Sequence, residues 1–227
     1  MRFLLPLALL MSAPVSADLL LNYNGFYGRM KKLQQPEYSD ITLAFALTGE
    51  SSGKPCQFYR IKLVSDQHDM TLDMAGNGFS TSGLSRPVSF DLDADGRMDS
   101  ISVPTGDDAL LAYDRNGNGR IDDGRELFGD QHGAANGFAE LGKYDDNADG
   151  RIDAQDAIFE RLSLLRFDAQ GRQSTQTLSQ AGVSAIELQA RDVQIALGAY
   201  DEIAQLGRFE FADGRSGQAA DLLLAQR

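Results

Sequence analysis

The chain has 227 residues and a formal net charge of −12, from 33 acidic and 21 basic side chains. Almost all of the excess lies between positions 91 and 156, where 17 acidic residues stand against 6 basic ones. Because nucleic-acid binding requires a basic surface, this composition excludes a nucleic-acid partner and indicates a localised acidic site.

The first 17 residues are typical of a secretory signal peptide. Arg2 gives a positive start, residues 3–11 are apolar, and the small residues at 15–17 form a cleavage site. A membrane anchor needs about 20 consecutive apolar residues, and no segment of the sequence reaches that length. We therefore expect cleavage after Ala17 and a mature protein without a membrane span, located in the periplasm or the medium.

Residues 18–86 predict a β-rich N-terminal domain. The segments SDITLAFALT (39–48) and CQFYRIKLV (56–64) have strand-like patterns and are separated by a cluster of turn-forming residues. The single cysteine, Cys56, has no partner for an internal disulfide. His68 and His132 have no serine or cysteine motif beside them and are expected in turns and loops.

Residues 87–227 predict a second domain, in which acidic loops are accompanied by short helices. The helices are expected at GFAELGKY (137–144), AQDAIFERLSLL (154–165) and STQTLSQAG (174–182). A closing hairpin is expected at 207–224, where Asp-Gly marks the turn. The expected fold class is therefore α+β, a β-rich N-terminal domain followed by EF-hand-like calcium loops with short helices and a C-terminal β-hairpin.

Three acidic segments of this second domain share one template. They are FDLDADGRMD (90–99), YDRNGNGRIDD (113–123) and YDDNADGRIDAQD (144–156). Calcium takes six to eight oxygen ligands, and an EF-hand-type loop supplies them from positions 1, 3, 5, 7, 9 and 12, with glycine at position 6. Each segment has an acid or amide at positions 1, 3 and 5 and glycine at 6, so the template predicts calcium binding.

The third loop fills every ligand position, with Asp145, Asn147, Asp149, the carbonyl of Arg151, Asp153 and Asp156. The second loop fills positions 1 to 9, with Asp114, Asn116, Asn118, the carbonyl of Arg120 and Asp122. Its position 12 is Arg125, which cannot be a side-chain ligand. We therefore expect Glu126 to close the second loop, with Gly124 accommodating the extra residue.

The first loop has fewer candidate ligands, which are Asp91, Asp93, Asp95 and Asp99. Strand-like sequences flank it, so we expect a strand–loop–strand turn whose missing ligand comes from Asp107 or Asp108. In the alternative interpretation, all three loops are only turns and helix caps. The repetition favours calcium, because unpaired carboxylates a few ångströms apart repel by about 4 kcal/mol at intermediate dielectric. Magnesium is the competing ion, but it prefers fewer protein ligands.

The segments GRELFGD, NGF-x-x-L and GRFEFADGRSGQAADLLL, together with the loops, resemble the calcium-binding region of bacterial RTX and haemolysin-type exoproteins over residues 87–225. The resemblance implies an EF-hand-like calcium module. The chain departs from that family in three ways: it has no glycine-rich nonapeptide repeat, a loop near 165–175 is reduced to Asp168, and no proline follows an aspartate, as self-processing at an Asp-Pro bond would require. LNYNGFYGRMKKL and KPCQF resemble a family of uncharacterised gammaproteobacterial exported proteins, which implies a Gram-negative source.

The sequence thus predicts an exported protein whose two or three calcium ions stabilise a structural or interaction domain, with a protein partner that the sequence does not identify. One alternative is a calcium-dependent hydrolase, although the acidic residues are already assigned to loops and an enzyme is not expected. The other alternative is a calcium sensor, although such proteins use paired helices with methionine-rich faces. No methionine follows Asp99.

Overall fold

The computed structural model describes residues 68–198 and 201–226. These residues belong to the second of two compact units, which begins at Val64. The expected signal peptide and most of the expected N-terminal domain lie outside the described residues. Within the described part of the chain, no helix is long and apolar enough to span a membrane.

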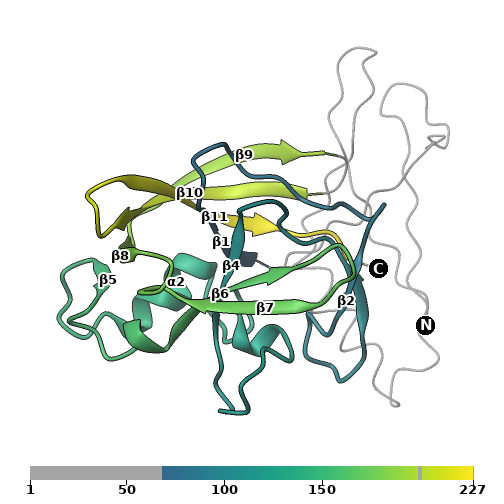
Figure 1. The fold of residues 1–227 in the computed structure, drawn as a ribbon, viewed down its shortest axis with the longest axis horizontal. Coiled ribbons are helices and arrows are strands. Elements are labelled where there is room, and N and C mark those ends of the chain that lie inside the picture. The colour runs from purple at the N-terminus through teal and green to yellow at the C-terminus, as the bar shows by residue number, and fades with distance from the viewer. Residues whose placement is uncertain (1–67, 199–200, 227) are drawn as a thin grey trace, which may run out of the picture. The chain divides into compact units, whose positions relative to one another are not determined.

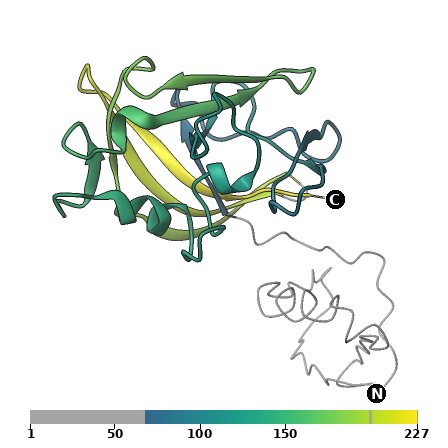
Figure 2. The ribbon, with the colours of Figure 1, turned by 90° about the horizontal axis from the view of Figure 1, so that it is seen from below.

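Nine antiparallel strands form the main sheet, in the order β5-β8-β10-β11-β1-β4-β6-β7, with β9 also paired to β10. The bounds are β1 His68–Asp73, β4 Ala109–Tyr113, β5 Arg151–Asp153, β6 Leu162–Phe167, β7 Gln173–Thr177, β8 Val183–Glu187, β9 Arg191–Leu197, β10 Asp201–Phe211 and β11 Ser216–Leu223. A separate two-stranded sheet pairs β2 (Val88–Phe90) with β3 (Asp99–Ile101). Figures 1 and 2 show that the main sheet is curled, most visibly along its long C-terminal strands.

Helices are few in the described residues. The α-helix α2 spans Gly137–Leu141. The three 3₁₀ helices are η2 (Gly124–Glu126), η3 (Gly142–Tyr144) and η4 (Phe159–Arg161). The expected α+β fold with EF-hand-like helices is therefore wrong: the described unit is mostly β. Residues 162–165 of the second expected helix lie in β6, and residues 174–177 of the third lie in β7.

The error has a physical reason in the sequence of β6. Its segment LSLLRF places Leu162, Leu164 and Leu165 in the core. The apolar spacing fits a helical stripe or a buried strand, and spacing alone cannot separate the two. Pairing with β4 on one side and β7 on the other satisfies the backbone of β6 as a central strand.

Apolar side chains cover both faces of the central strands. Leu111 points to a cluster that includes Phe128, whereas its neighbour Leu110 points to a cluster that includes Phe90. Alternate residues of a strand face opposite sides, so the unbroken apolar run ALLA in β4 is explained by burial on both faces. The β2–β3 hairpin contributes side chains to the second of these clusters and α2 to the first, and the GRELFGD segment contributes one to each. The first acidic loop joins β2 to β3, and the second begins directly after β4.

Candidate metal centre

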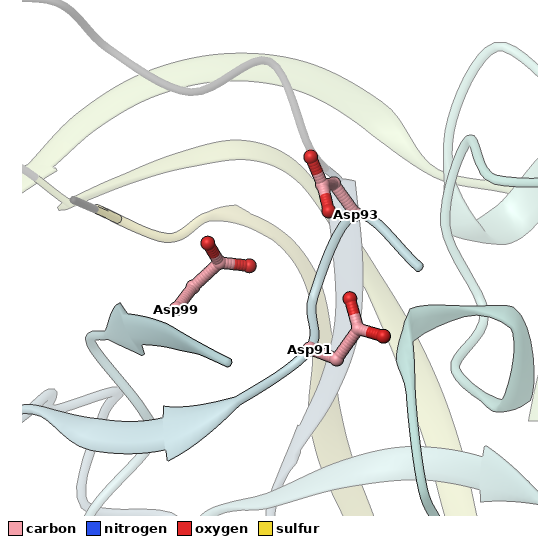
Figure 3. Close-up of side chains that lie close together, drawn as sticks. All are labelled: Asp91, Asp93 and Asp99. Carbon is pink, nitrogen blue, oxygen red and sulfur yellow. The ribbon is translucent and has the colours of Figure 1, made fainter. Parts of the chain in front are cut away.

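Three carboxylates of the first loop converge. Asp91 directly follows β2, Asp93 lies in the loop and Asp99 begins β3. One ligand oxygen from each lies within 4.8 Å of the other two, and Figure 3 shows the three side chains around one region. Oxygen donors from three carboxylates suit a hard divalent cation. This cluster could therefore hold a metal ion.

The carboxylates of this cluster repel one another. Burial raises the pKa of Asp99, and the negative charges of Asp93, Asp95 and Asp91 raise it further, although a hydrogen bond from the backbone N–H of Leu92 opposes the change. A bound cation would remove this repulsion. No other group of three or more acidic, histidine or cysteine side chains gathers as closely among the described residues.

All three loops fold around their first aspartate. In each loop this carboxylate accepts hydrogen bonds from the backbone N–H groups of positions 5 and 6. The donors and distances are Asp95 (3.0 Å) and Gly96 (3.0 Å) to Asp91, Asn118 (3.1 Å) and Gly119 (2.7 Å) to Asp114, and Asp149 (3.2 Å) and Gly150 (2.9 Å) to Asp145. The three loops therefore share one hydrogen-bonding scheme, in which the backbone turns around the carboxylate of position 1.

The backbone dihedral angles repeat with the hydrogen bonds. Position 6 has a positive φ in every loop, at Gly96 (87°), Gly119 (82°) and Gly150 (85°), which explains the glycine of the template. Position 4 is also left-handed, and in the first and third loops it is an alanine, Ala94 and Ala148, each at φ 57°. A left-handed residue other than glycine is unfavourable, so the surrounding hydrogen bonds must impose it.

A closing carboxylate holds the two ends of each loop together. In the third loop, Asp156 accepts from the N–H groups of Asp146 (2.8 Å) and Asp153 (2.9 Å). In the second loop, Glu126 accepts from Arg115 (2.9 Å) and Asp122 (2.8 Å), which occupy the same loop positions. Glu126 therefore takes the place of Asp156 although it lies one residue farther along the chain.

In the first loop the residue at position 9 has the closing role. Asp99 accepts a hydrogen bond from the N–H of Leu92 at position 2 (3.2 Å). Asp108, one of the two residues expected to complete this loop, instead accepts from the N–H of Ser80 (2.8 Å). The ligand set of the first loop is therefore smaller than that of the other two.

The remaining predicted ligands lie in the loops but interact with neighbours. The amides of Asn116 and Asn118 donate to Asp122. The guanidinium of Arg120 pairs with Asp122 (3.7 Å), and that of Arg151 pairs with Glu210 (2.8 Å) and Asp153 (3.6 Å). The arginine side chains are thus turned to carboxylates, which leaves only their backbone carbonyls for an ion.

The first and second loops contact each other through their backbones. Asp91 and Asp123 form a parallel β-bridge, and the N–H of Gly124 donates to the carbonyl of Asp91 (2.9 Å). A Cβ at position 124 would lie 1.9 Å from the carbonyl oxygen of Leu92. Only glycine permits this close approach. Gly124, which accommodates the extra residue of the second loop, therefore also joins that loop to the first.

Sequence reasoning missed a buried acidic cluster near the start of β1. His68 was expected in a turn, but it begins β1 and its Nδ1 hydrogen-bonds to Asp221. Asp69 follows it, is 2% exposed, and has a buried Oδ2 without a hydrogen-bond partner, as has Oδ1 of Asp130. Burial raises the pKa of Asp69 well above its usual range, and the charges of Asp130 and Asp221 add to the effect. The sequence HDMTLD alternates polar and apolar residues and gives no sign that Asp69 is buried.

Two family models match the chain. The SPM domain matches residues 70–225, and a protein family of unknown function, DUF2987, matches residues 15–96. The chain is also 36% identical over 169 residues to the iron-regulated protein FrpA of Neisseria meningitidis serogroup C. That alignment covers 61% of this chain and 15% of FrpA, so the chain spans only a small part of this relative's length.

The contact at Gly124 predicts the effect of a single methyl group. We expect Gly124→Ala to lower the free energy of unfolding by about 1–3 kcal/mol, because the added Cβ displaces the carbonyl of Leu92. Gly142→Ala is the matched control, since Gly142 has φ −61° and its Cβ would meet nothing closer than 3.9 Å. Urea unfolding of both variants checks the prediction, and equal midpoints would contradict it.

The buried Asp69 predicts a change of stability with pH. Its pKa is raised in the folded protein, so the stability that its neutral form contributes is fully present below about pH 3.9 and is lost as the pH rises through the folded value. We expect Asp69→Asn to raise the melting temperature at pH 7 and to have a shrinking effect toward pH 4. Thermal melts in EDTA measure this effect. The exposed Asp192→Asn is the control, and a pH-independent difference at Asp69 would refute the prediction.

Proposed function

Since the chain belongs to the SPM domain family over residues 70–225, we propose that it is an exported calcium-binding protein whose ions stabilise a structural or interaction domain. The observation that carries the proposal is the common hydrogen-bonding scheme of the three acidic loops. In each of them the side-chain oxygens of positions 1, 3 and 5 accept hydrogen bonds from backbone N–H groups of the same loop. We propose that these oxygens bind a cation. The family resemblance found in the sequence supports calcium as that cation.

Calcium fits the donor set better than magnesium does. Each of the second and third loops offers six oxygen positions from one continuous segment, in the spacing that calcium loops use. Magnesium retains several waters and takes few protein ligands. The closing residue of the third loop is Asp156, which is shorter than the usual glutamate, and extracellular calcium modules bind at about 0.1–1 mM. We therefore propose weak sites suited to an environment with millimolar calcium.

A stabilising role is supported by the way the loops enter the core. Ile121 and Ile152, at position 8 of the second and third loops, are 1% and 0% exposed. Position 8 of the first loop, Met98, is 68% exposed. An ion in the second or third loop would fix a backbone segment that also carries a core side chain, so its binding free energy would add to the stability of the fold.

The geometry gives less support to the other two functions. In the described residues the one α-helix, α2, has five residues, which is too short for the paired helices of a calcium sensor. The acidic residues of the loops accept backbone hydrogen bonds, as structural ligands do, and this favours a protein that is not an enzyme. Export to the periplasm or the medium is proposed from the signal-like sequence at residues 1–17.

Calcium should stabilise the protein measurably. At a hundred times the dissociation constant, one ion adds about 2.7 kcal/mol, and each kcal/mol raises the melting temperature of a domain of this size by about 2–4 °C. We expect Asp114→Asn and Asp145→Asn each to remove the contribution of one loop. Thermal melts in calcium, magnesium and EDTA test this.

Asp168→Asn is the matched control for these melts. Asp168 occupies an exposed turn and accepts N–H bonds from Gln170 and Arg172, but the turn has no further acidic residue. Its replacement should leave the calcium response unchanged. A melting temperature that is the same in calcium and in EDTA would sink the proposed function.

A further inference from the structure

We propose that residues 73–79 form a fourth cation loop, which Asp108 completes from a distant part of the sequence. The site would take a hard divalent cation of the calcium type. It is separate from the three acidic loops and does not depend on their being occupied.

The segment DMAGNGF folds like the second acidic loop. Asp73 Oδ1 accepts hydrogen bonds from the N–H groups of Gly76 (2.7 Å) and Asn77 (3.3 Å), and its Oδ2 accepts from Gly78 (2.8 Å). In the second loop, Asp114 receives bonds from the same positions, 4, 5 and 6, at 2.7, 3.1 and 2.7 Å. Asp73 therefore has the role of a first loop aspartate.

The dihedral angles agree with this assignment. Positions 4 and 6 are Gly76 (φ 71°) and Gly78 (φ 87°), against Gly117 (73°) and Gly119 (82°) in the second loop. The sequence template misses this segment because position 3 is Ala75, which has no side-chain oxygen. Position 5 is Asn77, and position 7 would supply the carbonyl of Phe79.

A second, independent observation points to a ligand. Asp108 is 2% exposed, and its Oδ2 accepts the N–H of Ser80, the residue that follows the loop (2.8 Å). Its Oδ1 is buried without any hydrogen-bond partner. The hydrogen bond from Ser80 places Asp108 beside the residue that directly follows the loop, with one carboxylate oxygen left for an ion.

A cation between these groups would satisfy the open oxygen of Asp108. The donors would be Asp73, Asn77, the carbonyl of Phe79 and Asp108, with water in the place of position 3. Gly76 and Gly78 also line an open groove, so an ion can reach the loop from solvent. Four protein oxygens are fewer than in the second and third loops, so we expect weaker binding here.

Each loop has its own reporter for the experiment. The N–H groups of Gly78, Gly96, Gly119 and Gly150 donate to the first aspartate of their respective loops. In a calcium titration of the full chain followed by amide NMR, we expect Gly78 to shift at higher calcium than Gly119 or Gly150. Magnesium, titrated separately, should move Gly78 less.

Two variants test the ligands. Asp108→Asn should raise the dissociation constant reported by Gly78 at least about tenfold, without moving that of Gly119. Ala75→Asp adds the missing oxygen at an exposed position and should lower the same constant about tenfold. Ala135→Asp adds an equal charge at another exposed position and is the control for a general electrostatic effect.

The outcomes separate this site from the proposed function. If Gly78 stays unmoved up to about 10 mM calcium while the other three glycines shift, the fourth site is wrong and the proposed function stands. If none of the four shifts, both are wrong. An Asp108→Asn protein in which Gly78 responds as in the wild type overturns the role of Asp108, and with it the site as described.

Discussion

The bond between the first aspartate of a loop and the backbone N–H groups a few residues later is the interaction on which this molecule depends. It turns the chain back on itself and accompanies left-handed dihedral angles at positions 4 and 6. Asp91, Asp114 and Asp145 all form it. Because the bonds are made within the loop, the shape of the loop does not require long helices on either side.

The same loops are joined to the sheet by very short connections. Asp114 directly follows β4, and Arg151–Asp153, which are positions 7 to 9 of the third loop, form the edge strand β5. A conventional EF-hand positions its loop between two helices. Here strands and 3₁₀ turns take that place, and η2 contains the closing residue Glu126. Order in the loops and order in the sheet are therefore coupled through the backbone.

The repeated acidic template allowed the loops to be located from the sequence, because each template is local and its spacing matches one ligand scheme. The sequence also indicated that Glu126, not Arg125, would join the two ends of the second loop, and its hydrogen bonds to the backbone do so. Its role as a ligand stays a prediction. The fold class could not be predicted in the same way, because Leu162, Leu164 and Leu165 fit a helix or a strand equally well. Contacts between segments that lie far apart in the sequence could not be predicted either. Asp108 faces Ser80, and His68 bonds to Asp221, and neither pairing leaves a signal in the local sequence.

The position of β1 has a consequence for how the molecule is assembled. β1 is the first described strand, yet it pairs with the last one, β11, in a register that joins His68 to Leu223. A chain that emerges from its N-terminus onward presents all three acidic loops before β11 exists. The loops can thus acquire local order early, whereas the centre of the sheet must wait for the final segment of the chain.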